Sequence, residues 1–183
     1  MAYDAIKNAH KPRIHTFIAL SPFNMKYVLQ KEPNDIKKIA IDAVKHAKSL
    51  IGENGDVQFS VEHFGDCVDN MPFVLDTLQE VVAAGATTIN LPNTVERTYP
   101  TDFVKRVEQV INALPKDIIV AVHCHNDLGM ATATTVESYF AGATQLEGCL
   151  NGLGERAGNT NLFEVAVTLH NCGIDVPMNL KEI

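Results

Sequence analysis

The hydrophobic and polar residues of this 183-residue chain follow two alternating patterns. Short apolar runs rich in β-branched residues are typical of buried strands, and longer stretches with apolar residues three or four positions apart are typical of helices. The first pattern predicts strands over residues 13–20, 57–62, 87–91, 117–123 and 144–149. The second pattern predicts helices over residues 34–51, 70–83, 101–114, 130–141 and 161–171.

The predicted helices also carry signals at their ends. Asn34 stands where an N-cap is expected, and Pro100 opens a helix that has Asp102 in its first turn. Two helices end in the same phrase, Ala-Gly-Ala-Thr, which places Gly85 and Gly142 at the C′ position, where a left-handed residue is favoured. Each of these phrases leads directly into a predicted strand.

The regular alternation of strands and helices indicates right-handed βαβ units and a parallel sheet. Both the doubly wound sheet and the (β/α)8 barrel use this order. No G-x-G-x-x-G segment follows a strand, which disfavours the dinucleotide-binding version. Polar residues gather at the carboxyl ends of the strands, where barrel enzymes carry their chemistry. We therefore expect an α/β fold, with a partial TIM (β/α)8 barrel of about five βα units favoured and the doubly wound sheet as the alternative.

Composition narrows the classes of protein further. Hydrophobic residues make up 46% and charged residues 20%, which indicates a globular domain. The formal charge of −7 argues against nucleic-acid binding, which relies on positive charge. No apolar run is long enough to span a membrane and no apolar segment opens the chain, so we expect a cytoplasmic protein. None of the four cysteines forms a C-x-x-C pair, which disfavours structural zinc and a disulfide scaffold.

A His-Cys-His segment ends the predicted strand over residues 117–123. Alternate strand residues point to the same side, so His123 and His125 can face one metal ion while Cys124 turns away. Imidazoles with an oxygen-rich remainder suit Mg²⁺, Mn²⁺ or Zn²⁺. The alternative is that the two histidines only pack or form hydrogen bonds.

The other strands offer polar side chains at the same level. Taken one at a time, these residues are compatible with solvated strand ends or turn chemistry. Taken together, they favour a site that several strand ends share. The residues that share a face within each strand are His15 and Phe17; Ser60 and Glu62; and Asn90, Pro92 and Thr94.

The loop over residues 151–159 lies between the last predicted strand and helix. Gly152 and Gly154 would let the backbone approach a ligand closely. Glu155 and Arg156 offer both charges, and Asn159 stands at or near the N-cap of the next helix.

The segments HCHNDLG and NGLGERAGN, in this order, resemble the 2-isopropylmalate synthase branch of the DRE-TIM metallolyases. The resemblance runs through nearly all of the chain. It implies a barrel enzyme that condenses acetyl-CoA with a 2-oxo acid and uses a divalent metal ion. It implies metal binding by His123, His125 and Asn159, and catalytic roles for Glu62 and Glu155. It also implies that the 2-oxo acid is surrounded by His15, Ser60, Asn90, Pro92 and Thr94.

The resemblance also sets the expected partners and the alternatives. It implies small-molecule substrates. The acidic charge and the lack of a long apolar run argue against nucleic-acid and membrane partners. Five parallel strands would leave two open edges, which favours a homo-oligomer. The Asn-x-Pro-x-Thr segment favours 2-oxoisovalerate as the acyl acceptor and leucine biosynthesis as the pathway. The Glu62-His63-Phe64 segment is similar to citramalate synthases, which use pyruvate, and Glu96 replaces a common glycine.

The family's first-strand signature, Asp-x-Thr-x-Arg-Asp-Gly, does not occur in the chain. In the family this segment supplies a metal-ligating aspartate and a catalytic arginine. We therefore expect one partial catalytic domain over residues 1–183 that corresponds to strands four to eight, without the N-terminal strands and the C-terminal regulatory domain. By itself this polypeptide is expected to be inactive, and the alternative from another class is a non-catalytic fragment that self-associates.

Overall fold

Five parallel strands form one sheet in the computed structural model, which describes residues 2–182. The strands are β1 (Arg13–Ala19), β2 (Asp56–Glu62), β3 (Thr88–Asn93), β4 (Ile119–Cys124) and β5 (Gln145–Glu147). The α-helices are α1 (Ala2–Ile6), α2 (Pro33–Ile51), α3 (Met71–Ala83), α4 (Pro100–Ala113), α5 (Ala131–Phe140) and α6 (Leu162–Asn171). Short helical segments are the π-helix η1 (Asn24–Leu29) and the 3₁₀ helices η2 (Phe64–Asp66), η3 (Leu150–Gly152) and η4 (Leu180–Glu182).

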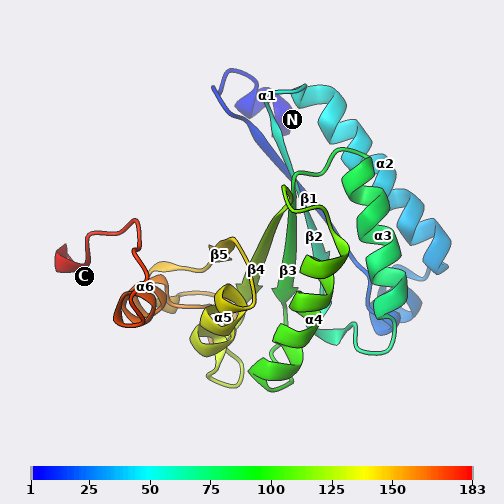
Figure 1. Ribbon diagram of the computed structural model, residues 1–183. Coiled ribbons are helices and arrows are strands. Elements are labelled where there is room, and N and C mark those ends of the chain that lie inside the picture. Colours follow the sequence, from blue (N-terminus) through cyan, green and yellow to red (C-terminus); the bar gives the residue numbers. More distant parts are fainter. Residues whose placement is uncertain (1, 183) are drawn as a thin grey trace.

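The order of the strands distinguishes between the two architectures that the sequence left open. Each strand pairs with the next one along the chain, from β1 to β5, without the reversal of order found in a doubly wound sheet. Helices α2 to α6 contact one another in succession, and Figure 1 shows α2, α3 and α4 on the same side of the strands. This arrangement is an arc of a (β/α)8 barrel, with helices outside and an inner face left open.

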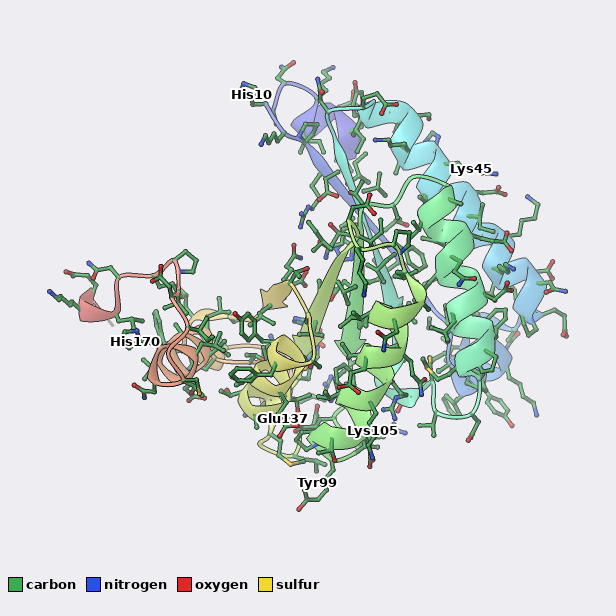
Figure 2. The ribbon with its side chains drawn as sticks, viewed as in Figure 1. His10, Lys45, Tyr99, Lys105, Glu137 and His170 are labelled. Carbon is green, nitrogen blue, oxygen red and sulfur yellow. The ribbon has the colours of Figure 1, made fainter. Side chains whose placement is uncertain are left out.

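The two faces of the sheet differ in polarity because alternate strand residues point to opposite sides. Apolar side chains of the outer face, such as Phe59, Leu91 and Val122, are fully buried against the helices. The helices meet them with residues three or four apart, including Val74 and Leu78 of α3. The polar faces of the helices point to solvent, as Lys45, Lys105 and Glu137 do in Figure 2. The core therefore lies outside the arc, and the inner face is free to carry polar groups.

All five predicted strands and the five long helices are present, with shifted ends. The prediction of Asn34 as an N-cap is wrong, because α2 begins at Pro33 and Glu32 precedes it. Gly85 and Gly142 adopt φ values of 115° and 111°, as expected after a helix. Strand β5 covers three residues only, and the π-helix η1 lies in a segment for which the sequence pattern predicted no element.

Burial keeps two of the cysteines as thiols rather than thiolates. The pKa of Cys67 and that of Cys124 are both raised to about 12, chiefly because burial disfavours the charged form. All four cysteines are free. Within residues 2–182 we find no helix that combines the length and the apolar character needed to cross a membrane.

Candidate functional site

A cleft of about 390 Å³ lies on the inner face of the sheet, at the carboxyl ends of the strands. Nine of the ten site residues predicted from the sequence line this cleft. The tenth, Asn159, is not among the lining residues. Two further residues, Phe17 and Glu147, complete the lining. The lining residues are His15, Phe17, Ser60, Glu62, Asn90, Pro92, Thr94, His123, His125, Glu147 and Glu155.

His123 and His125 enter this cleft from the end of β4. Their ring centroids lie 5.1 Å apart and the ring planes are nearly perpendicular, at 87°. Cys124, between them, is buried in the core on the opposite face. The alternation that the sequence indicated therefore brings the two imidazoles together and keeps the thiol out of the cleft.

Asn159 lies beside His125 although the two residues are far apart in sequence. They form an isolated antiparallel bridge, supported by the bond from Asn126 N to Gly158 O at 2.9 Å. The alternative role of Asn159, as the cap of the last helix, does not hold, because Asn161 takes that place and accepts a hydrogen bond from the Phe163 amide. Asn159 therefore does not cap the helix, and it lies at the edge of the site beside His125.

Two buried polar atoms at this point have no partner among the described residues. They are His125 Nδ1 and Asn159 Oδ1. Leaving a buried polar atom unpaired is unfavourable, so such atoms in a native protein call for an explanation, an unseen ion being one. A ring nitrogen and an amide oxygen are both donors to divalent metal ions.

The glycines of the loop make room for the loop itself rather than for a ligand. A Cβ atom on Gly154 would lie 2.1 Å from Asn159 Nδ2, and one on Gly158 would lie 2.3 Å from the Gly152 carbonyl oxygen. The structure therefore gives Gly152 and Gly154 a different role from the expected close approach to a ligand. These glycines allow the backbone to fold tightly around the Asn159 side chain.

A chain of hydrogen bonds connects the acceptor-binding candidates along the inner face. His15 Nε2 lies 2.6 Å from Ser60 Oγ, and Asn90 donates to the same hydroxyl at 2.9 Å. Asn90 also donates to Glu147 Oε2 at 3.3 Å. These side chains come from β1, β2, β3 and β5, so the network crosses the sheet.

Glu147 is the residue of the cleft that the sequence reasoning missed. It stands opposite His123 in the register of β4 and β5. Its Oε1 accepts hydrogen bonds from Gln58 at 2.8 Å and from Gln145 at 2.7 Å, and Arg13 Nη1 donates to both glutamine carbonyl oxygens. A signal existed in the alternation of Gln145, Leu146 and Glu147, which places the two polar residues on one face.

The electrostatics of the cleft favour neutral imidazoles. The pKa values of His15, His123 and His125 are all lowered, in each case mainly because burial disfavours the charged ring. The negative charge of Glu147 partly opposes this effect at His15 and His123. The rings are thus neutral at pH 7, which is the state that binds metal ions.

The charged and imidazole side chains of the cleft do not by themselves form a complete metal site. Among residues 2–182, no group of three or more His, Cys, Asp or Glu side chains is placed to hold an ion. The described residues offer two imidazoles and the Asn159 amide, which is a partial set of ligands.

The HMGL-like family profile matches residues 1–183, the whole chain. The chain belongs to the HMGL-like family. The match confirms the relationship indicated by the HCHNDLG and NGLGERAGN segments.

Curated 2-isopropylmalate synthases resemble the chain closely. The 2-isopropylmalate synthase 2 of Leptospira interrogans is 54% identical over 183 residues, and the chain spans 43% of its length. The 2-isopropylmalate synthase of Pyrococcus abyssi is 43% identical over 188 residues, and the chain spans 38% of it. The resemblance to the 2-isopropylmalate synthase branch is therefore confirmed, and the chain corresponds to less than half of each relative.

Solved structures of HMG-CoA lyases share the fold. The HMG-CoA lyase of Brucella melitensis superposes with a TM-score of 0.75 at 20% identity, covering 98% of this chain and 65% of that one. An HMG-CoA lyase of Acinetobacter baumannii, solved with coenzyme A and 3-methylmalate, gives 0.71 at 17% identity, covering 98% and 59%. These matches confirm the partial TIM-barrel fold.

Proposed function

We propose that this chain forms the acceptor-binding part of an enzyme that condenses acetyl-CoA with 2-oxoisovalerate to give 2-isopropylmalate. The observation that carries the proposal is the cleft, which gathers both imidazoles and the predicted acceptor-binding side chains in one place. The identity of 54% with a 2-isopropylmalate synthase supports this choice of reaction.

The cleft offers different surfaces to the two ends of a 2-oxo acid. Ser60 and Asn90 supply polar groups, and His15 is held in place by its contact with the Ser60 hydroxyl. Pro92 and Phe17 supply apolar surface, and Phe17 is 61% exposed on the inner face. A branched aliphatic side chain is suited to the apolar part, while the carboxylate and ketone would lie toward the imidazoles.

The residues present fit a divalent metal ion. His123, His125 and Asn159 would hold it, since His125 Nδ1 and Asn159 Oδ1 are buried and have no partner among residues 2–182. The family resemblance implies a further ligand, the aspartate of the first-strand signature, which does not occur in this sequence. When bound, such an ion would act as a Lewis acid and template for the ketone and carboxylate oxygens.

In the condensation a proton leaves the methyl group of acetyl-CoA, and the resulting carbanion forms a carbon–carbon bond with the ketone carbon. The ketone oxygen gains a proton, and water then cleaves the thioester and releases free CoA. Glu62 and Glu155 both line the cleft and are our candidates for moving or orienting these protons.

A chimera tests this function directly. This chain should replace the matching segment of the Leptospira 2-isopropylmalate synthase 2, which supplies the remaining parts of the protein. We expect the chimera to release CoA from acetyl-CoA with 2-oxoisovalerate, because the Leptospira protein then supplies the parts of the enzyme that this chain does not cover. A free-thiol assay measures the release, and the isolated chain is expected to show none.

The Glu62→Gln chimera tests the role of this carboxylate. Its rate should fall by about 100-fold or more relative to the unmodified chimera if Glu62 takes part in proton transfer. A folded chimera that releases no CoA with 2-oxoisovalerate or with pyruvate would disprove the function. A chimera that prefers pyruvate would instead support the citramalate alternative.

Self-association is a second candidate, and the edges of the sheet favour it. Within the described residues, β1 pairs only with β2 and β5 only with β4, so each leaves one edge unpaired. Open edges invite pairing with another chain. We expect the isolated chain to form a homo-oligomer, which size-exclusion chromatography with light scattering measures. A stable monomer would contradict this expectation.

A further inference from the structure

Three loops at the carboxyl edge of the sheet are tied together by one arginine. Arg156 Nε donates to Asp127 Oδ1 at 2.6 Å, and its Nη2 donates to Asp127 Oδ2 at 3.0 Å. The same Nη2 donates to the Thr94 carbonyl oxygen at 2.7 Å. The guanidinium therefore connects the loop after β5 with the loops after β4 and β3.

A buried carboxylate reinforces the same connection. Glu96 is 2% exposed, and its Oε2 accepts hydrogen bonds from the Leu128 amide at 2.5 Å and the Met130 amide at 3.4 Å. The Glu96 amide in turn donates to Asp127 at 3.4 Å. Glu96, which replaces a common glycine of the family, thus binds the loop after β3 to the start of α5. We call Arg156, Asp127 and Glu96 the loop clamp.

The backbone at Arg156 is held in an unfavourable conformation. Its φ is 57°, in the left-handed region that residues with a side chain rarely adopt. Such strain persists when surrounding contacts over-determine the conformation, and it is concentrated at functional sites. Here the bidentate pair with Asp127 and the bond to Thr94 are contacts of that kind, because the planar guanidinium fixes direction as well as distance.

The residues next to each end of the clamp belong to the proposed site. Glu155 precedes Arg156 and lines the cleft, and Asn159 follows three residues later beside His125. Thr94 lines the cleft as well, while its carbonyl oxygen accepts from Arg156. A shift of the guanidinium would therefore move groups of the cleft that come from β3, β4 and β5.

We propose that Arg156 is a positioning residue that holds Asn159 at the distance from His125 required to bind one divalent cation. Arg156 itself contacts no ligand. This inference rests on the proposed function, because it assumes the metal site formed by His123, His125 and Asn159. It extends that function by assigning a role to a residue that the reaction does not use.

Calorimetric titration of the full chain with Mn²⁺ tests the role. We expect Arg156→Ala to weaken binding by about 10-fold or more, the range seen when groups that orient metal ligands are removed. Arg156→Lys keeps the charge but loses the bidentate geometry, so it should also bind more weakly than the unmodified chain. Arg97→Ala is the matched control, because Arg97 is two-thirds exposed and reaches Asp66 only at 3.9 Å.

Two further readouts separate positioning from a general loss of structure. The visible absorption of bound Co²⁺ should change in Arg156→Lys, because it reports the geometry of the ligands, while circular dichroism should confirm an unchanged fold. Hydrogen exchange should become faster in residues 148–160 in both Arg156 variants and stay the same in Arg97→Ala.

The outcomes distinguish this inference from the function on which it rests. If the unmodified chain binds Mn²⁺ and Arg156→Ala binds it equally well, the positioning role is wrong and the metal site stands. If the unmodified chain does not bind Mn²⁺, both the metal site and the positioning role are overturned.

Discussion

Replacing His123 or His125 by alanine is expected to abolish most of the affinity of the chain for Mn²⁺. Removing groups that only orient a metal ligand costs 10- to 100-fold in affinity, so losing a ligand itself should cost about 100-fold or more. The structure supports this size of effect, because the two rings lie 5.1 Å apart and Asn159, which bridges to His125, has an amide oxygen without a partner among the described residues. Calorimetry on the two single variants measures it.

The matched control is His170→Ala. His170 lies in the last turn of α6, is exposed and is not among the residues that line the cleft (Figure 2). The substitution His170→Ala removes an imidazole outside the site, so the Mn²⁺ affinity of this variant should equal that of the unmodified chain. Unchanged affinity in both His123→Ala and His125→Ala would remove the assignment of these residues as ligands.

The order of the elements was predictable because it depends on local patterns. Runs of β-branched residues and helical periodicity predicted all five strands, and glycines at the helix ends marked two of the transitions correctly. The ends of the elements were less predictable. Asn34 is a favourable cap by residue type, yet Pro33 at the preceding position already fixes a helical φ and starts α2 there.

The contents of the cleft were predictable to the extent that they depend on the side to which each strand residue points. The parity of His123 and His125 followed from the sequence, because alternate residues share a face. The pairing of His125 with Asn159 did not, since it depends on how the loop after β5 folds back on β4. Glu147 was missed for a related reason, because its partners Gln58 and Asn90 lie on strands distant in sequence.

Glu96 shows a different limit. The sequence revealed only that a carboxylate stands where a glycine is common, and it offered no partner. The structure supplies one in the amides at the start of α5, 32 and 34 residues further along the chain. A departure from a family pattern can therefore be a structural contact rather than a change in the reaction.

The second large effect concerns stability. Phe103→Ala should lower the free energy of unfolding by about 3–5 kcal/mol, the usual cost of deleting a buried phenyl ring and leaving a cavity. Phe103 on α4 is fully buried and packs edge-on against Phe64, with ring centroids 5.7 Å apart and planes at 84°. That contact joins α4 to η2, directly after Glu62, so the core behind the cleft depends on it. Urea unfolding followed by circular dichroism measures the loss.

Phe140→Ala is the control for ring size, because Phe140 is 56% exposed and ends α5 at the surface. Its free energy of unfolding should change by no more than about 0.5 kcal/mol, as is usual for surface substitutions. Phe103→Leu should fall between the two, since it keeps part of the buried volume. A loss below about 1 kcal/mol in Phe103→Ala would mean that α4 is not packed on the sheet as described, because a rigid core cannot lose a phenyl ring at so small a cost.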